Sequence, residues 1–383
     1  MKTSGLSTPK SYFVLFLIFM FSFSFISFGR SGKDQLNAMK GYIDKSGKEP
    51  QQYVISKFEK CDIVILNQFN NLKHEVEFVN SLIPAIFDEG VNTLAMEFGN
   101  REDQNKVDAL IFAKNFDEET AKRILFDFKE YGIWGYQEYL ELLRTSWSVN
   151  KGIKENDKKF RIVMLNSPSI RSSEKNSEFA KMIERELLSK GKKALVYVSA
   201  CHSHNCKNSS TAEIYPLKAR FSSNLSDKVF SIALHSPWMA TEKSDGNFKA
   251  LVRPADGLID EVLAKTGYKP VGFDINNSPF CNIKDSRSVY YDRKNDYNLN
   301  MVFNGYIFLK EYSDYEPLTW IENFITFDNL YEVKKYYRGI NSELKIETVE
   351  YATDLCSSLN ASLLSKAKML RDEAYVKLDD RNN

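Results

Sequence analysis

The segment that indicates the fold most clearly is CDIVILNQFNNLKHEVEFVNSLIPAIFDEGVNTLAMEF, residues 61–98. It contains a short apolar run, an amphipathic stretch and a second apolar run in succession. The first run, Cys61–Asn67, is typical of a strand that is covered on both faces. Apolar residues then recur at helical spacing from Val79 to Phe87, and Gly90 stands where a helix C-cap belongs. Asn92–Phe98 is the second apolar run. This order predicts a strand, a helix and a parallel strand.

The same alternation continues toward the C-terminus. Further strands are expected at Phe160–Asn166, Ala194–Ala200, Val229–His235 and Pro270–Asp274, with Gly305–Leu309 as a last, edge strand. Helices are expected at Glu118–Tyr131, Tyr136–Asn150, Ser177–Lys190 and Leu258–Lys265. The pattern predicts an α/β fold, a layered, open and largely parallel sheet with helices on both faces. The long polar loop Cys201–Lys228 indicates a functional insertion or a lid.

The composition limits the classes of function. The chain has 383 residues with 52 basic and 51 acidic side chains, and this balance gives no sign of a nucleic-acid partner. Hydrophobic residues at 43% and aromatic residues at 13% suffice for a large buried core. The sequence contains no glycine-rich phosphate loop and no Gly-x-Ser-x-Gly elbow, which argues against nucleotide binding and ordinary serine-hydrolase chemistry.

The N-terminus has the pattern of an export signal. Lys2 and Lys10 precede the apolar run Tyr12–Phe28, which ends in Ser27-Phe28-Gly29. We expect residues 1–29 to be a signal peptide or a membrane anchor, so that the chain is exported and is periplasmic, secreted or anchored. This segment is then the one expected contact with a membrane. Residues 30–60 are expected to form an arm, 61–329 the α/β domain and 330–383 a C-terminal helical extension.

Polar side chains fall repeatedly at the ends of the expected strands. These residues are His74, Glu97, His202, His204, His235 and Asp274. Because the carboxyl ends of parallel strands line the ligand crevice of an open α/β sheet, we expect a site there. Scattered histidines that are hydrogen-bonded within the fold are the alternative.

The residue types admit both metal binding and catalysis. His202 and His204 face the same side of an extended chain, and with His74 and Glu97 they form a possible set of ligands for zinc or another divalent metal. Cys201 and Cys206 flank this pair as thiolates or as a disulfide. Glu97, His202 and His235 are the candidate catalytic residues. An ion pair of Glu97 with Arg101, and a turn-capping role for Asp274, remain open.

At these residues the chain resembles the superfamily of erythromycin-esterase-like proteins, the haem-binding lipoprotein ChaN and the Tiki proteases. Members carry Gly-Glu-x-His after the first strand, a further His in the next helix and a strand that ends in Glu. The matching positions are Asn67, Gln68, Asn70, His74 and Glu97, and Ser199-Ala-Cys-His202 matches a second Gly-x-x-His element. The resemblance covers about residues 61–327 and implies an erythromycin-esterase-like or ChaN-like α/β fold.

The departures from the family pattern bear on function. Gln68 and Asn70 replace the family Glu and His, so they keep hydrogen bonding but lose the proton-transferring pair. The resemblance implies that Gln68, Asn70, His74 and Asp274 bind a ligand, with a divalent metal or haem as the candidate cofactor. Three hypotheses follow: an exported protein that binds a metal, haem or small ligand at the strand ends, a hydrolase of an ester or amide, or a surface module with a decayed site.

Overall fold

The structure is a computed structural model, and it describes residues 32–68, 72–129, 132–154, 159–199, 217–223, 225–241, 248–288, 298–370 and 375–377. Its centre is a seven-stranded sheet in the order β3-β2-β4-β1-β5-β9-β8. The strands are β1 (Ile63–Gln68), β2 (Thr93–Asn100), β3 (Arg161–Asn166), β4 (Ala194–Ser199), β5 (Val229–Leu234), β8 (Val271–Asp274) and β9 (Gly305–Phe308). Apart from the antiparallel β8–β9 pair, each neighbouring pair is parallel.

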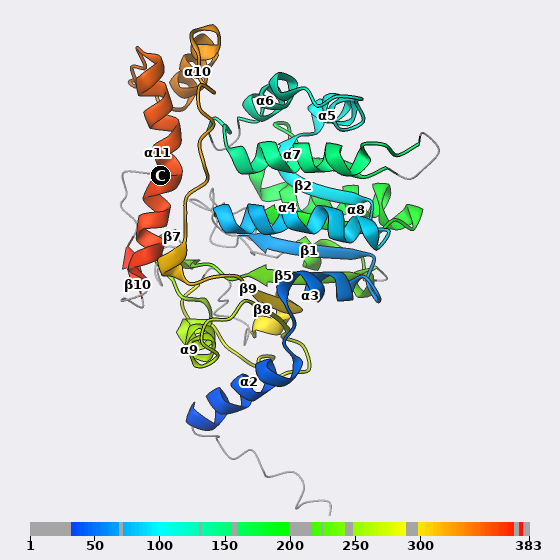
Figure 1. Ribbon diagram of the computed structural model, residues 1–383. Coiled ribbons are helices and arrows are strands. Elements are labelled where there is room, and N and C mark those ends of the chain that lie inside the picture. Colours follow the sequence, from blue (N-terminus) through cyan, green and yellow to red (C-terminus); the bar gives the residue numbers. More distant parts are fainter. Residues whose placement is uncertain are drawn as a thin grey trace, which may run out of the picture.

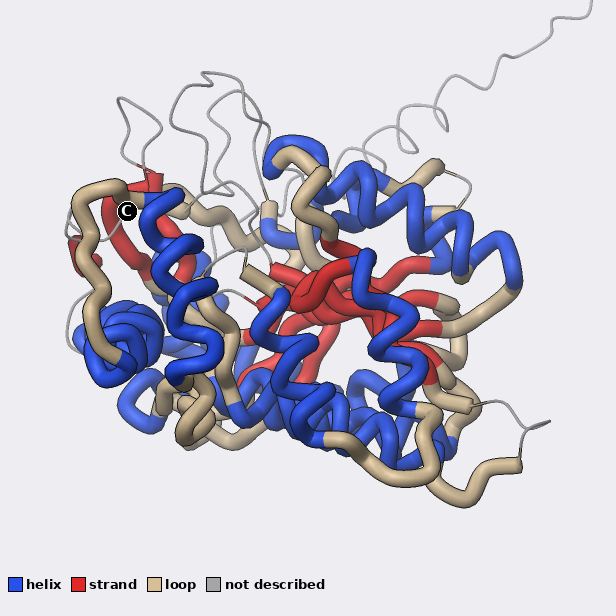
Figure 2. Tube along the Cα trace, turned by 90° about the horizontal axis from the view of Figure 1, so that it is seen from above, coloured by secondary structure: helices blue, strands red, loops and turns tan. Residues whose placement is uncertain are grey.

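Helices cover both faces of this sheet (Figures 1 and 2). Alternate residues of β1 divide between two cores, because successive side chains of a strand point to opposite faces. Val64 and Leu66 pack with the helices of one face, whereas Ile63 and Ile65 pack with the helix of the other. The first face carries α4 (Lys73–Asp88), α5 (Gln104–Ile111), α6 (Glu118–Asp127) and α7 (Gln137–Asn150), and the second carries α8 (Lys175–Glu186). The α/β prediction is confirmed.

One expected strand lies elsewhere in the sheet. β9, expected at the edge, pairs with β5 on one side and with the antiparallel β8 on the other. β8 is therefore the edge strand. Between residue 32 and β1 the structure describes the helices α2 (Gly32–Ser46) and α3 (Pro50–Lys57). Between them Lys48 forms an antiparallel bridge to Gly272 of β8, with N–H···O distances of 3.0 and 2.8 Å.

The remaining elements form a smaller layer beside the main sheet (Figure 1). Here β6 (Trp238–Thr241), β7 (Phe248–Val252) and β10 (Tyr375–Lys377) make a three-stranded antiparallel sheet. The helices are α9 (Leu258–Lys265), α10 (Phe327–Ile340) and α11 (Val349–Met369). The sequence pattern predicted helices in the C-terminal stretch but not the short strand β10.

The expected signal peptide or anchor, residues 1–29, lies outside the described residues. In the part of the chain that the structure describes, no helix has the length and apolar character needed to cross a membrane.

Candidate functional site

The helices that follow two neighbouring strands, β2 and β3, lie on opposite faces of the sheet. The helices that follow β2 cover one face, and α8, which follows the adjacent β3, covers the other. In open α/β sheets, ligands bind beyond the carboxyl ends of the strands at such a change of side. β4 lies on the other side of β2, and its last residue, Ser199, is in register with Gln68 at the end of β1. The ends of these four strands define the carboxyl edge of the sheet.

Glu97 and Lys175 form the charged centre of this edge. Glu97 lies near the end of β2 with 1% of its surface exposed, and its Oε2 accepts a hydrogen bond of 2.7 Å from the Ser199 backbone N–H. Lys175, also 1% exposed, is the first residue of α8. Burial lowers the pKa of Lys175 to about 8, and the negative charge of Glu97 opposes that shift. An ammonium close to its pKa near neutral pH is suited to proton transfer as well as to ion pairing.

His74 and Glu75 lie in the first turn of α4, and both are buried. Among the described residues, neither ring nitrogen of His74 and neither carboxyl oxygen of Glu75 has a hydrogen-bond partner. Burial is the main cause of both pKa shifts: it lowers the pKa of His74 to about 3 and raises that of Glu75 to about 8. At neutral pH the two side chains are therefore predominantly uncharged.

His235 follows β5 in a second buried polar cluster. Its Nδ1 is 2.9 Å from the hydroxyl of Tyr306, and its Nε2 is 3.7 Å from a carboxylate oxygen of Asp260. The ring also stacks on Tyr312, with 5.0 Å between centroids. Burial lowers the pKa of His235 to about 3 and raises that of Asp260 to about 7. Positive charge on His235 would lower the pKa of His74, which places the two histidines within electrostatic reach of each other.

Asp274 does not reach the carboxyl edge. It ends β8, and because β8 runs antiparallel to β9, Asp274 is in register with Gly305 at the beginning of β9. It therefore lies at the opposite edge, where it accepts hydrogen bonds from the Tyr53 hydroxyl at 2.6 Å and from Lys57 Nζ at 2.5 Å. The expectation that Asp274 shares a crevice with the other strand-end residues does not hold, since that expectation assumed a parallel strand.

The other residues predicted for the site divide into two groups. Gln68 is described, and it is buried at the end of β1. Asn70, His202 and His204 lie outside the described residues. Within the described ranges, no group of three or more His, Cys, Asp or Glu side chains is placed to hold a metal ion.

Sequence reasoning missed Glu75, Lys175 and Asp260. Glu75 precedes Val79 by one helical turn on the apolar face of α4, so the helical spacing contained the signal for its burial. Lys175 and Asp260 stand among other charged residues, and nothing in their local sequence separates them from a solvated helix surface.

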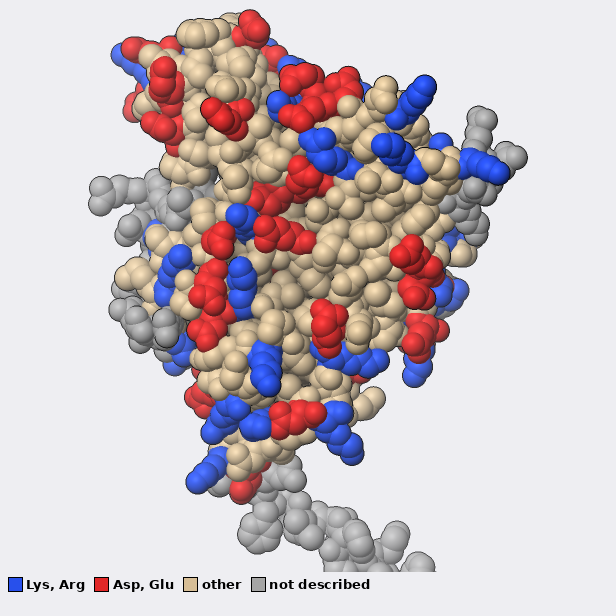
Figure 3. Space-filling model, viewed as in Figure 1, with Lys and Arg blue, Asp and Glu red and all other residues tan. Residues whose placement is uncertain are grey.

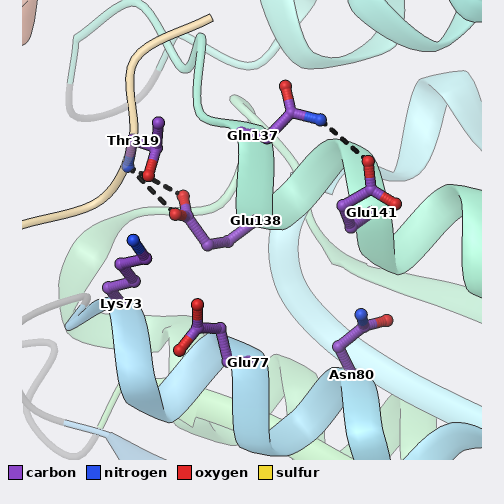
Figure 4. A pocket seen from close by; sticks show the side chains of 7 residues that line it. All are labelled: Lys73, Glu77, Asn80, Gln137, Glu138, Glu141 and Thr319. Atoms are coloured by element: carbon purple, nitrogen blue, oxygen red, sulfur yellow. Dashed lines mark hydrogen bonds between the residues drawn. The ribbon is translucent and has the colours of Figure 1, made fainter.

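A groove on the surface lies between α4 and α7 (Figure 4). It has a volume of about 330 Å³ and is lined by Lys73, Glu77, Asn80, Gln137, Glu138, Glu141 and Thr319. Figure 3 shows acidic side chains gathered where these two helices meet. Both carboxylate oxygens of Glu138 accept from the Thr319 backbone N–H, at 3.1 and 2.9 Å. The groove therefore has an acidic lining with Lys73 at one end.

No family model and no curated protein matches the chain. Among solved structures, a succinoglycan biosynthesis protein is similar with a TM-score of 0.46 and 10% identity over 73% of this chain and 97% of that one. A Bacillus cereus protein is similar with a TM-score of 0.44 and 10% identity over 71% and 96%. ChaN of Campylobacter jejuni, a protein with cofacial haem binding, has a TM-score of 0.27 and 13% identity over 47% and 84%. Likenesses this distant assign neither a family nor a function, so the functional argument rests on the side chains.

Proposed function

We propose that the protein binds a small ligand at the carboxyl edge of its sheet, next to Glu97 and Lys175. The proposal is based on the burial of the Glu97 carboxylate and the Lys175 ammonium, each 1% exposed. Both lie at the carboxyl edge, where the helices after β2 and after β3 cover opposite faces of the sheet. Buried charges are costly, and charged groups with shifted pKa values cluster at functional sites. Haem and a divalent metal are the first ligands to test, because His202 and His204 follow β4 closely in the sequence.

The test is a titration of the purified full-length chain with haemin and with Zn²⁺, followed by visible absorption and by calorimetry. We expect saturable binding of one of them. Glu97→Gln should weaken that binding by about tenfold, which corresponds to the loss of one charge-assisted contact of about 1.4 kcal/mol. Glu102→Gln is the matched control, because Glu102 lies outside the buried pair and accepts from Ser167 Oγ at 2.5 Å. The proposal fails if neither ligand binds, or if both variants bind as the unmodified chain does.

Hydrolysis of an ester or amide is the second candidate function. It is favoured by the pKa of Lys175, about 8, which leaves a fraction of the amine unprotonated at neutral pH as a general base. Turnover of a p-nitrophenyl ester should then rise with pH up to about 8 and be abolished by Lys175→Met. Turnover no faster than in a buffer control, together with ligand binding, would leave binding as the function.

Export is also part of the proposal, and it is supported by the basic and apolar pattern of residues 1–29. Mass spectrometry of the chain from its native host should find a mature N-terminus near Arg30. An intact Met1 in the membrane fraction would establish an anchor instead.

A further inference from the structure

Glu75 is a fully buried acid. Its side chain is inaccessible, and within the described ranges neither carboxyl oxygen has a hydrogen-bond partner. The Leu72 amide is near enough to oppose the pKa shift slightly, but burial dominates it. The preceding residue, His74, is 6% exposed, and its two ring nitrogens have no partners in the part of the chain that the structure describes. Native proteins pair such buried polar groups almost without exception, so this position calls for an occupant that supplies hydrogen bonds.

Two other buried acids differ from Glu75 in accepting a hydrogen bond from a backbone amide or in having a cation beside them. Glu97 accepts from the Ser199 amide and lies in the field of Lys175. Asp260 lies in the field of Arg253, which opposes the rise of its pKa. For Glu75, the influences on the pKa are burial and the Leu72 amide, and no cationic side chain of the described residues is among them. What Glu75 lacks is a positively charged hydrogen-bond donor.

Four buried tyrosines lie within electrostatic reach of Glu75. Its charge acts on Tyr139 of α7, Tyr197 of β4, Tyr306 of β9 and Tyr315, all fully buried. The His74 ring also packs on that of Tyr315, with 4.5 Å between centroids. Aromatic faces attract cations through their quadrupole, most strongly where water is excluded. We call these six residues, the four tyrosines with His74 and Glu75, the Glu75 cluster.

We propose that the Glu75 cluster binds the ammonium group of a small organic amine. An ammonium has three donors and no acceptor, and the cluster offers two carboxylate oxygens and the lone pair of a neutral imidazole. The acid gives up its proton as the amine binds: Glu75–COOH and R–NH₃⁺ form Glu75–COO⁻···⁺H₃N–R, and one H⁺ passes to the buffer. A neutral amide or alcohol would displace no proton.

This site is separate from the ligand site proposed at Glu97. Ala95 of β2 packs with the α8 face, and Glu97, two residues further on, shares its side of the strand. Glu75 is on α4, which covers the opposite face. Tyr139 and Tyr197 of the Glu75 cluster also lie in the field of Glu97, so the two proposals are distinguished by their ligands and by the release of a proton.

The test is isothermal titration of the full chain with methylammonium chloride at pH 6, 7 and 8, in buffers of different ionisation enthalpy. A ligand of two heavy atoms is expected to bind with a dissociation constant on the order of 10 mM. With the pKa of Glu75 at about 8, binding at pH 7 should release close to one proton, and the affinity should rise nearly tenfold from pH 6 to 7. His74 has a pKa of about 3 and the pKa values of the four tyrosines lie well above 10, so they stay neutral throughout.

Variants test whether methylammonium binding and proton release depend on Glu75. Glu75→Gln keeps the shape but cannot ionise, and it should abolish both the binding and the proton release. Glu77→Gln is the matched control, since Glu77 is exposed on the same helix. Circular dichroism and a thermal melt verify that each variant folds. The absence of binding to the unmodified chain, binding without proton release, binding that survives Glu75→Gln, or equal binding of neutral acetamide would each overturn the proposal.

Discussion

The Glu75 carboxyl makes the stability of the fold depend on pH. Burial raises its pKa from 4.5 to about 8, so the folded state holds the proton more tightly than the unfolded state does. The contribution of Glu75 to the free energy of unfolding is therefore greatest below pH 4.5, falls as the pH rises toward 8, and is constant above that. A shift of about 3.5 units at about 1.36 kcal/mol per unit gives a loss of at most about 5 kcal/mol.

Urea unfolding of the unmodified chain and of Glu75→Gln at pH 5, 6, 7 and 8 measures this contribution. The difference between the two free energies isolates Glu75, because the remaining titrations are common to both chains. Among these, Asp260 has a raised pKa, so its contribution to the free energy of unfolding also falls as the pH rises. His74 and His235 have lowered pKa values, so their contributions fall as the pH falls. We expect the free energy of unfolding of Glu75→Gln to rise steadily relative to that of the unmodified chain between pH 5 and 8. Parallel stability curves would refute the idea that Glu75 is buried as an acid.

Three further changes test the packing and the electrostatics. Glu97→Gln should lower the pKa of Lys175 further below 8, because the charge that opposes the effect of burial is lost; the pH dependence of amine acylation, followed by mass spectrometry, measures this, and an unchanged profile would contradict it. Gly272→Ala should cost about 1–3 kcal/mol in urea unfolding, because the added Cβ would lie 2.4 Å from Cγ of Tyr53; Gly41→Ala in α2, with no heavy atom within 4 Å and no positive φ, is a control for that steric contact. Leu66→Ala, at a fully buried position, should cost about 2–5 kcal/mol, and a loss below 1 kcal/mol would show that the site collapses around the smaller side chain.

The alternation of strands and helices could be predicted from the sequence because each element carries its own period. Ile63 to Leu66 are apolar without interruption, as a strand covered on both faces requires, and Val79 to Ile86 repeat at helical spacing. Strand direction has no such signal. Val271–Asp274 is too short for its pattern to distinguish a parallel from an antiparallel partner, and the error displaced Asp274 to the wrong edge.

The candidate site was predictable in part. Glu97 was expected to be buried because it interrupts an apolar strand, and it is 1% exposed. The burial of Lys175 depends on where α8 begins relative to the ends of the strands. Tertiary packing decides that position, and the local sequence does not contain it. His202 and His204, the expected centre of a metal site, remain predictions because they lie outside the described residues.

The bridge between Lys48 and Gly272 bears on how this sheet avoids self-association. An open sheet edge presents unpaired N–H and C=O groups to any other extended chain. Here the segment between α2 and α3 takes up both hydrogen-bonding groups of Gly272, and α3 supplies Tyr53 and Lys57 to Asp274 at the end of the same strand. The N-terminal arm therefore covers part of the β8 edge and blocks its pairing with a strand of another molecule. Proteolytic trimming beyond about residue 48 would expose that edge, and the trimmed chain should aggregate at concentrations at which the intact chain stays monodisperse.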